Sequence, residues 1–213
     1  DYIREGLIGY YTGRGRSNTD ENKNILPDLS GNGNNLENKN FAYTVDSGYG
    51  DGYIQYDGVD DFSYIENLQG GDGKTLFFVL SGTVNQNAIK NKWNGGYYLS
   101  DGTVFAFSRN KVEANSNNYT KVFLNGVDSK TKGIDGQDSI NVISLSTAGN
   151  NFNNRFTLAS TLNASIYCIK ERVHDLIMYN RELTDEENKY MYQVSCQYNG
   201  EDIDGKAGEN NEF

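Results

Sequence analysis

Two short turns bring carboxylate and amide side chains close together along the chain. Asp28 and Asn32 lie in one turn, and Asp60 and Asp61 end another that begins at Asp57. Carboxylates, Asn amides and the backbone carbonyls of Gly-rich loops are the ligands that calcium takes in proteins. The same side chains also cap turns by hydrogen bonding to their own backbone. The residues therefore leave two interpretations open: a calcium site on Asp28, Asn32, Asp60 and Asp61, or turn capping without a metal.

A second group of functional side chains surrounds the only tryptophan, Trp93, in residues 91–98. An aromatic ring beside amides and Gly is typical of a sugar-binding loop, because the ring stacks on the C–H face of a sugar while the amides bind its hydroxyls. Such a ring also serves as an anchor at protein interfaces. Packing of Trp93 against the core is the alternative. The predicted ligand-binding residues are Trp93, Asn94, Tyr97 and Tyr98, and a second aromatic group comprises Tyr43, Tyr49 and Tyr53.

Catalytic constellations are not evident in the sequence. The one histidine, His174, lies inside a segment that reads as a strand, and no Gly-x-Ser-x-Gly sequence is present to supply a nucleophile for a Ser-His-Asp triad. Retaining glycoside hydrolases need two carboxylates about 5 Å apart. No predicted strand alternates such residues, and the nearest run, 201–204, is in a polar tail. We therefore expect His174 to be a packed or surface residue and the protein not to be an enzyme.

The charge, hydropathy and cysteine content of the chain limit the kinds of partner and of covalent cross-link that we expect. The 213 residues carry a formal net charge of −10, and an acidic chain repels phosphate backbones, so we expect no nucleic-acid partner. No run of about 18 apolar residues is present, so we expect no membrane insertion. Two cysteines, Cys168 and Cys196, exclude a disulfide framework and leave either one bridge or two free thiols. The chain starts at Asp without a visible signal peptide, which suggests a processed product or a piece of a longer protein.

Short apolar or alternating segments, separated by turns rich in Gly, Asn and Asp, predict many short β-strands. The predicted strands are residues 7–11, 52–56, 62–65, 75–80, 96–99, 103–107, 119–124, 140–145, 164–169 and 174–179. The apolar run 75–80 is continuous, which indicates burial on both faces. Asn125-Gly126 is the clearest hairpin signal, since a type I′ turn needs positive φ at both positions.

One helix is predicted near the C-terminus. Thr184 and Glu187 have the spacing of a capping box, in which each bonds to the backbone N–H of the other, and the helix is expected over 185–194. The predicted fold class is all-β, a two-sheet antiparallel jelly-roll sandwich with one short C-terminal helix. Its domain covers residues 1–196, and residues 197–213 form a polar, acidic tail or linker.

Three short sequence motifs, in this order, resemble those of the laminin-G-like, concanavalin A-like family: DLSGNGNN at 28–35, YDGVDDF at 56–62 and YNRELTDEE at 179–187. The resemblance runs from about Gly6 to Val194. The sequence at its two ends is closer to the bacterial and bacteriophage versions than to the animal modules. It implies a jelly-roll sandwich. Several members of the family carry calcium at the sandwich edges, which the resemblance extends to this chain as an expectation.

The resemblance also implies a class of function. Similar domains serve as non-catalytic adhesion or carbohydrate-recognition domains of larger extracellular, cell-surface or virion proteins. The expected partners are a glycan or surface-protein ligand and neighbouring chains of a larger assembly. The alternative is a structural or assembly module, such as a bacteriophage capsid decoration or fibre domain. A glycoside hydrolase is the third interpretation.

Overall fold

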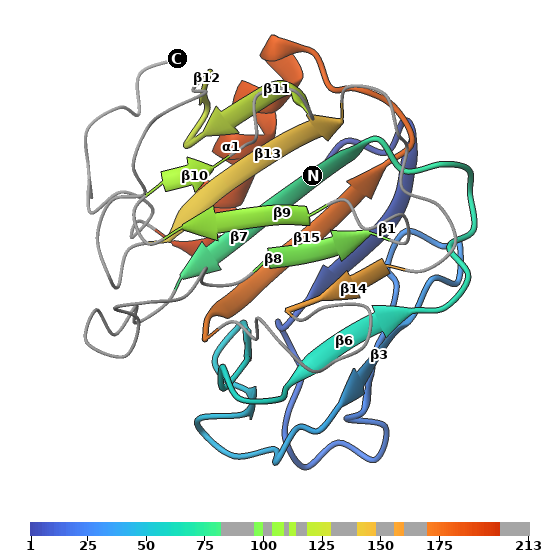
Figure 1. The fold of residues 1–213 in the computed structure, drawn as a ribbon, viewed down its shortest axis with the longest axis vertical. Helices are drawn as coiled ribbons and strands as arrows, with labels where there is room; N and C mark the ends of the chain where they lie inside the picture. Colours follow the sequence, from blue (N-terminus) through green and yellow to red (C-terminus); the bar gives the residue numbers. More distant parts are fainter. Residues whose placement is uncertain are drawn as a thin grey trace.

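A computed structural model of the chain describes residues 1–81, 96–99, 104–108, 111–113, 119–128, 140–147, 156–159 and 170–200. These residues form two antiparallel β-sheets and one helix (Figure 1). The predicted two-sheet sandwich with a C-terminal helix is therefore confirmed. The predicted strand at 164–169, which includes Cys168, and the tail beyond residue 200 lie outside the described residues.

The larger sheet, sheet A, has the strand order β12-β11-β13-β7-β15-β5-β4, and β1 also pairs with β15. Its strands are β1 (Leu7–Thr12), β4 (Gly48–Tyr49), β5 (Ile54–Gln55), β7 (Thr75–Ser81), β11 (Tyr119–Leu124), β12 (Val127–Asp128), β13 (Asn141–Thr147) and β15 (Arg172–Tyr179). The hairpin predicted at Asn125-Gly126 joins β11 to β12, with φ of 51° and 73° at the two turn residues.

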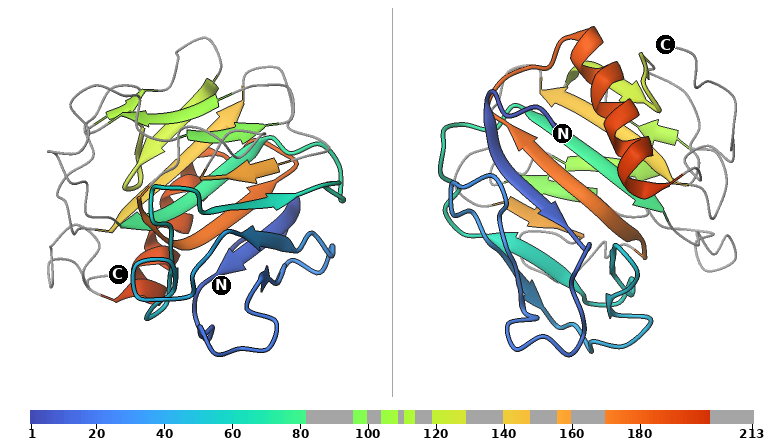
Figure 2. Two further views of the ribbon diagram at one scale, coloured as in Figure 1. Left: turned by 60° about the horizontal axis from the view of Figure 1, so that its bottom comes forward. Right: turned by 180° about the vertical axis from the view of Figure 1, so that it is seen from behind.

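The second sheet, sheet B, has the order β10-β9-β8-β14-β6-β3-β2. Its strands are β2 (Ile25–Leu26), β3 (Leu36–Lys39), β6 (Phe62–Ile65), β8 (Gly96–Leu99), β9 (Val104–Ser108), β10 (Lys111–Glu113) and β14 (Phe156–Leu158). Helix α1 (Asp185–Asn199) packs on the face of sheet A that points away from sheet B (Figure 2). The described part of the molecule thus has three layers: sheet B, sheet A and α1.

Strand β7 shows how the layers share the apolar residues. Successive side chains of a strand point to opposite faces. Leu76, Phe78 and Leu80 lie in the core between the sheets, while Phe77 and Val79 pack with residues of α1. All seven residues of the strand are buried, which confirms the burial on both faces that the continuous apolar run predicts.

Helix α1 begins as predicted and ends later. The Thr184 hydroxyl accepts the N–H of Glu187 at 3.1 Å, and the Glu187 carboxylate accepts the N–H of Thr184 at 2.8 Å. The predicted end at Val194 is wrong, because the helix runs to Asn199 and is followed by Gly200 with φ 77°. Glycine reaches such positive φ without the strain that a Cβ causes, so it commonly ends helices. Within the described residues, no helix has the length and apolar character to span a membrane.

Candidate functional site

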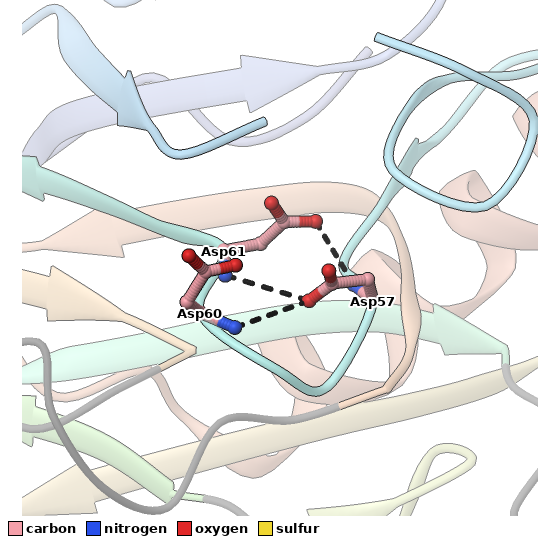
Figure 3. A group of neighbouring side chains, drawn as sticks. All are labelled: Asp57, Asp60 and Asp61. Atoms are coloured by element: carbon pink, nitrogen blue, oxygen red, sulfur yellow. Dashed lines mark hydrogen bonds between the residues drawn. The ribbon is translucent and has the colours of Figure 1, made fainter. Parts of the chain in front are cut away.

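The turn between β5 and β6 gathers three carboxylates, from Asp57, Asp60 and Asp61, with ligand oxygens within 4.8 Å of one another (Figure 3). The Asp57 carboxylate accepts three backbone N–H groups, from Val59 at 2.7 Å, Asp60 at 3.3 Å and Asp61 at 3.5 Å. Asp61 in turn accepts the N–H of Asp57 at 2.9 Å and the hydroxyl of Ser47 at 3.1 Å. Turn capping, one of the two interpretations of these residues, is therefore realised here.

Asp61 is the carboxyl of this turn whose pKa is clearly shifted by its surroundings. Its side chain is fully buried, and burial, together with the nearby carboxylates of Asp57 and Asp60, raises the pKa of Asp61 to about 6. The hydrogen bonds from Ser47 and the Asp57 backbone act in the opposite direction but do not offset burial. The folded state therefore holds the proton of Asp61 to a higher pH than the unfolded chain does.

This shift predicts a pH-dependent stability. A carboxyl whose pKa is raised in the folded state stabilises the fold below its unfolded pKa, and that contribution is lost as the pH rises through the folded pKa. We expect the stability of the wild type relative to Asp61→Asn to fall by about 2–3 kcal/mol between pH 4 and pH 7. Urea unfolding of both proteins at each pH measures the difference, and two parallel curves would contradict it.

Asp28 lies in a different loop, and its carboxylate is engaged in hydrogen bonds to the chain itself. Its carboxylate accepts the N–H of Tyr10 at 3.0 Å, the N–H and hydroxyl of Ser30 at 2.8 Å each, and the N–H of Asn34 at 3.0 Å. The Asn32 amide donates to the Ser30 hydroxyl at 3.0 Å. These bonds fix the loop against β1. Among the described residues, the three-carboxylate group does not include Asp28.

The predicted metal-binding residues thus separate into two places. The structure brings Asp60 and Asp61 together and adds Asp57, which the four-residue prediction omitted although it lies only three residues before Asp60. It places Asp28 and Asn32 in the loop before β3, where their hydrogen bonds serve the chain itself. The signal for Asp57 was present in the sequence as the first residue of the same turn.

The predicted ligand-binding residues fall at the edge of the described chain. Trp93 and Asn94 lie outside the described residues, and Tyr97 and Tyr98 belong to strand β8, whose backbone pairing is defined. Tyr98 pairs with Thr157 of β14.

A polar and aromatic cluster that the sequence reading missed lies on the outer face of sheet B, and we call it the Tyr64 cluster: Glu37, Lys39, Phe62 and Tyr64. The Tyr64 hydroxyl donates to the Glu37 carboxylate at 2.5 Å, and Lys39 forms an ion pair with the same carboxylate. The Lys39 ammonium lies 5.7 Å from the centre of the Tyr64 ring, and the Phe62 ring stacks on Tyr64 at 6.0 Å. These contacts hold one aromatic ring between an acceptor and a donor.

The strand pairing extends this cluster across the sheet. Glu37 pairs with Tyr64, Tyr64 with Thr157, and Thr157 with Tyr98. One row of residues across β3, β6, β14 and β8 therefore links the cluster to a predicted ligand-binding residue. The hydrogen bond from Lys39, and then that from Tyr64, lowers the pKa of Glu37, so the carboxylate is ionised at neutral pH. The spacing Glu37-x-Lys39 and Phe62-x-Tyr64 is the strand alternation that could have revealed the cluster.

His174 is packed within sheet A, as expected. It is buried, its Nε2 lies 2.8 Å from the Ser81 hydroxyl, and burial, with Arg14 and Arg172 nearby, lowers the pKa of His174 to about 4. A catalytic triad needs a carboxylate on the second ring nitrogen to orient the imidazole. In the described part of the chain no carboxylate bonds to His174. This Ser-His contact could not be predicted from the sequence, because 93 residues separate the two.

The chain is similar to known proteins in its fold and not detectably in its sequence. No protein-family model matches the chain, and no curated sequence is detectably similar. A tryptophan-to-alanine mutant of HCR/D is 12% identical over 92% of this chain and 52% of its own, with a TM-score of 0.50. The botulinum neurotoxin serotype D binding domain is 12% identical over 91% and 52%, with a TM-score of 0.45. Trypanosoma rangeli sialidase is 11% identical over 90% and 33%, with a TM-score of 0.42.

The chain spans about half the length of the first two solved structures. At 12% identity and a TM-score of 0.50, the likeness to the HCR/D mutant concerns the fold alone, and it agrees with the β-rich architecture described above. A laminin-G-like jelly roll stays a prediction. The chain is a two-sheet antiparallel β-sandwich with a helix on one face.

Proposed function

We propose that this chain is a non-catalytic carbohydrate-recognition domain whose ligand binds on the outer face of sheet B. The observation that carries the proposal is the Tyr64 cluster. Helix α1 packs on part of the outer face of sheet A, against residues of β7, β13 and β15 (Figure 2), whereas no helix among the described residues covers the outer face of sheet B. The side chains of Glu37 and Lys39 are 36% and 40% exposed there, and Tyr64 is partly exposed.

The chemistry of the cluster suits a sugar. An aromatic ring offers apolar area for the C–H face of a pyranose, while an ionised carboxylate accepts, and an ammonium donates, hydrogen bonds to hydroxyls. The mutual contacts of Glu37, Lys39 and Tyr64 order all three side chains before a ligand arrives. Prior ordering lowers the entropy cost of binding.

The backbone pairing continues from the Tyr64 cluster toward a predicted ligand-binding residue. From Tyr64 the backbone pairing passes through Thr157, which is fully buried, to Tyr98. Trp93 and Asn94 lie outside the described residues. The proposal is that such a domain works in an extracellular, cell-surface or virion protein.

Replacement of Tyr64 by alanine tests this assignment. We expect the wild type to bind at least one class of glycan on an array, and Tyr64→Ala to weaken that binding by about tenfold, equal to about 1.4 kcal/mol, because the stacking surface is removed. The matched control is Tyr190→Ala, since Tyr190 is 45% exposed on α1, which covers the other sheet. Calorimetric titration of each protein with the glycan found on the array gives the affinities.

Two results would contradict the proposal. One is that no glycan binds, with or without calcium. The other is that Tyr64→Ala and Tyr190→Ala bind as the wild type does. If no glycan binds and light scattering finds an assembly of this chain, the structural or assembly module becomes the better description, and the exposed Val45 and Val59, at 80% and 74%, are the side chains to replace first.

Calcium binding is a second part of the proposal. The three carboxylates of Asp57, Asp60 and Asp61 lie close enough to share one divalent cation, which would offset the repulsion that Asp61 feels. The glycan array in calcium and in a chelator tests whether the ion supports recognition. Asp60→Asn is the suitable variant, because the Asp60 carboxylate accepts no hydrogen bond among the described residues.

A further inference from the structure

Arg172, at the start of β15, differs from the other arginines of the described chain. Arg14, Arg16 and Arg181 each form an ion pair with a carboxylate, and the Arg4 guanidinium donates to a backbone carbonyl. Arg172 is partly buried, yet only its Nε donates a hydrogen bond, to Gln55 at 3.2 Å. In the described part of the chain no carboxylate neutralises it. The two terminal nitrogens of its guanidinium therefore remain available.

The guanidinium is nevertheless held in place. Gln55 is buried, and its own amide nitrogen donates to the backbone carbonyls of Tyr56 at 2.7 Å and Glu171 at 3.3 Å. These two bonds fix which way the Gln55 oxygen points, and that oxygen accepts from Arg172. Strand pairing places Gln55, Arg172 and Ser81 in one row across β5, β15 and β7.

Tyr53 supplies a platform beneath the guanidinium, whose carbon lies 5.1 Å from the centre of the ring. The platform is itself confined: a Cβ on Gly13 would lie 2.3 Å from the Tyr53 backbone, and a Cβ on Gly50 would lie 2.2 Å from its ring. Stacking on an aromatic ring leaves the edge of a guanidinium, with its donor fork, open to a ligand. Arg172 thus has an ordered guanidinium whose two terminal nitrogens donate no hydrogen bond within the described part of the chain.

The neighbouring His174 adds a polar wall. Its ring meets the edge of Tyr53 at 5.5 Å, and its Nε2 lies 2.8 Å from Ser81. The low pKa of His174 keeps it neutral at pH 7, with Arg14 and Arg172 as the charged groups that act on it. The positive charge beside His174 therefore comes from guanidinium groups, and of the two only Arg14 has a carboxylate partner, Asp175.

We propose that Arg172, stacked on Tyr53 and bordered by Ser81 and His174, binds the carboxylate of an acidic saccharide. A fixed guanidinium fork matches the two oxygens of a carboxylate in a bidentate pair, which is stronger and more directional than a single ion pair. In a chain of net charge −10, an ordered guanidinium without an acidic partner is complementary to an anionic ligand. The site lies on sheet A, separate from the Tyr64 cluster; carboxylate recognition goes beyond the proposed function, while the choice of a saccharide as its source rests on that function.

Tetragalacturonate is the probe, and its fully methyl-esterified form is the matched ligand control because esterification removes only the charges. We expect calorimetric titration at low salt to detect binding of the acid and not of the ester, and binding to weaken at 0.5 M salt by screening. Arg172→Gln should weaken binding at least about tenfold, and Arg172→Lys should weaken it severalfold, because lysine keeps the charge but has no fork. Lys170→Gln, an equal change of charge at an exposed residue two positions away, should bind as the wild type does.

His174 provides an independent readout, since it is the only histidine and its ring proton needs no assignment. A bound carboxylate offsets the charge of Arg172, so saturating tetragalacturonate should raise the pKa of His174 in an NMR titration. Arg172→Gln should show no such response to the probe. Thermal unfolding of each variant checks that the fold is retained.

The outcomes separate this inference from the proposed function. Equal binding of the acid and its ester, or an unchanged affinity in Arg172→Gln, would overturn the carboxylate site while leaving recognition at the Tyr64 cluster intact. Binding of tetraglutamate but not tetragalacturonate would overturn the saccharide as its source. Loss of binding in Tyr64→Ala with no loss in Arg172→Gln would place the acidic sugar on sheet B and overturn the site on sheet A.

Discussion

Replacing Arg14 with methionine is expected to lower the free energy of unfolding by about 3–5 kcal/mol. Arg14 pairs with the Asp175 carboxylate at 2.5 Å, and the side chain of Asp175 is fully buried. The hydroxyl of Tyr2 also donates to Asp175, at 2.9 Å. Without Arg14 the carboxylate would stay in the interior with no cation, and an uncompensated buried charge is among the most destabilising changes that a single substitution makes.

The same pair fastens the last turn of α1. The Arg14 guanidinium donates to the Asn199 amide oxygen at 3.1 Å and lies 5.0 Å from the centre of the Tyr198 ring. The Asn199 amide nitrogen reaches Asp175 at 3.4 Å. Loss of Arg14 therefore also removes the contacts that hold the helix end on sheet A, and hydrogen exchange in residues 195–199 should become faster.

Urea unfolding measures this loss, and Lys39→Met is the matched control. Lys39 and Glu37 also form an ion pair, but their side chains are 40% and 36% exposed, and exposed pairs contribute about 0–1 kcal/mol. A double replacement, Arg14→Met with Asp175→Leu, should recover part of the loss because neither charge is then buried alone. If Arg14→Met costs no more than Lys39→Met, the buried pair is not the constraint we describe.

Gly13→Ala is expected to cost about 3 kcal/mol or more, at or above the upper end of typical overpacking losses. A Cβ on Gly13 would lie 2.3 Å from the carbonyl carbon and 2.4 Å from the Cα of Tyr53. These are backbone atoms next to β5, so relief requires a strand to move rather than a side chain to rotate. The displacement would also shift the ring beneath Arg172.

Gly15→Ala gives the comparison for this effect. A Cβ on Gly15 would meet nothing within 4 Å, although its φ of 73° makes alanine strained, at a cost of about 1–2 kcal/mol. Denaturant unfolding of both variants should therefore rank Gly13→Ala as the less stable. The reverse order would mean that the backbone around Tyr53 yields more easily than its contacts indicate.

Much of the fold is readable from local sequence. The runs at 75–80 and 119–124 and the Asn125-Gly126 turn gave strands and a hairpin at the observed places, because periodicity and turn chemistry act over a few residues. The capping box located the start of α1 for the same reason. Gly200 was an available signal for its end, and the prediction overlooked it.

Strands β2, β3, β4, β10 and β14 were not predicted. The sequence of β3, Leu-Glu-Asn-Lys, has little intrinsic strand preference, and β2 has only two residues. Strand formation depends on the neighbour that supplies the hydrogen bonds. Here β6 pairs with β3 and β14, and a polar segment becomes the outer face of a sheet. The Tyr64 cluster arises from that pairing, which explains why the sequence reading missed it.

Local sequence is enough to specify the secondary structure of the apolar segments, the turns and the closeness of Asp60 and Asp61, since each depends on residues close along the chain. Which distant side chains meet depends on the three-dimensional fold. Arg14 and Asp175 are 161 residues apart, and Gln55 and Arg172 are 117 apart. Such contacts depend on strand order and register, and a shift of one residue in register would turn every side chain of a strand to the opposite face. The strand order and register cannot be inferred from the spacing of residues in the sequence, because burial and hydrogen bonding across the whole sandwich select them.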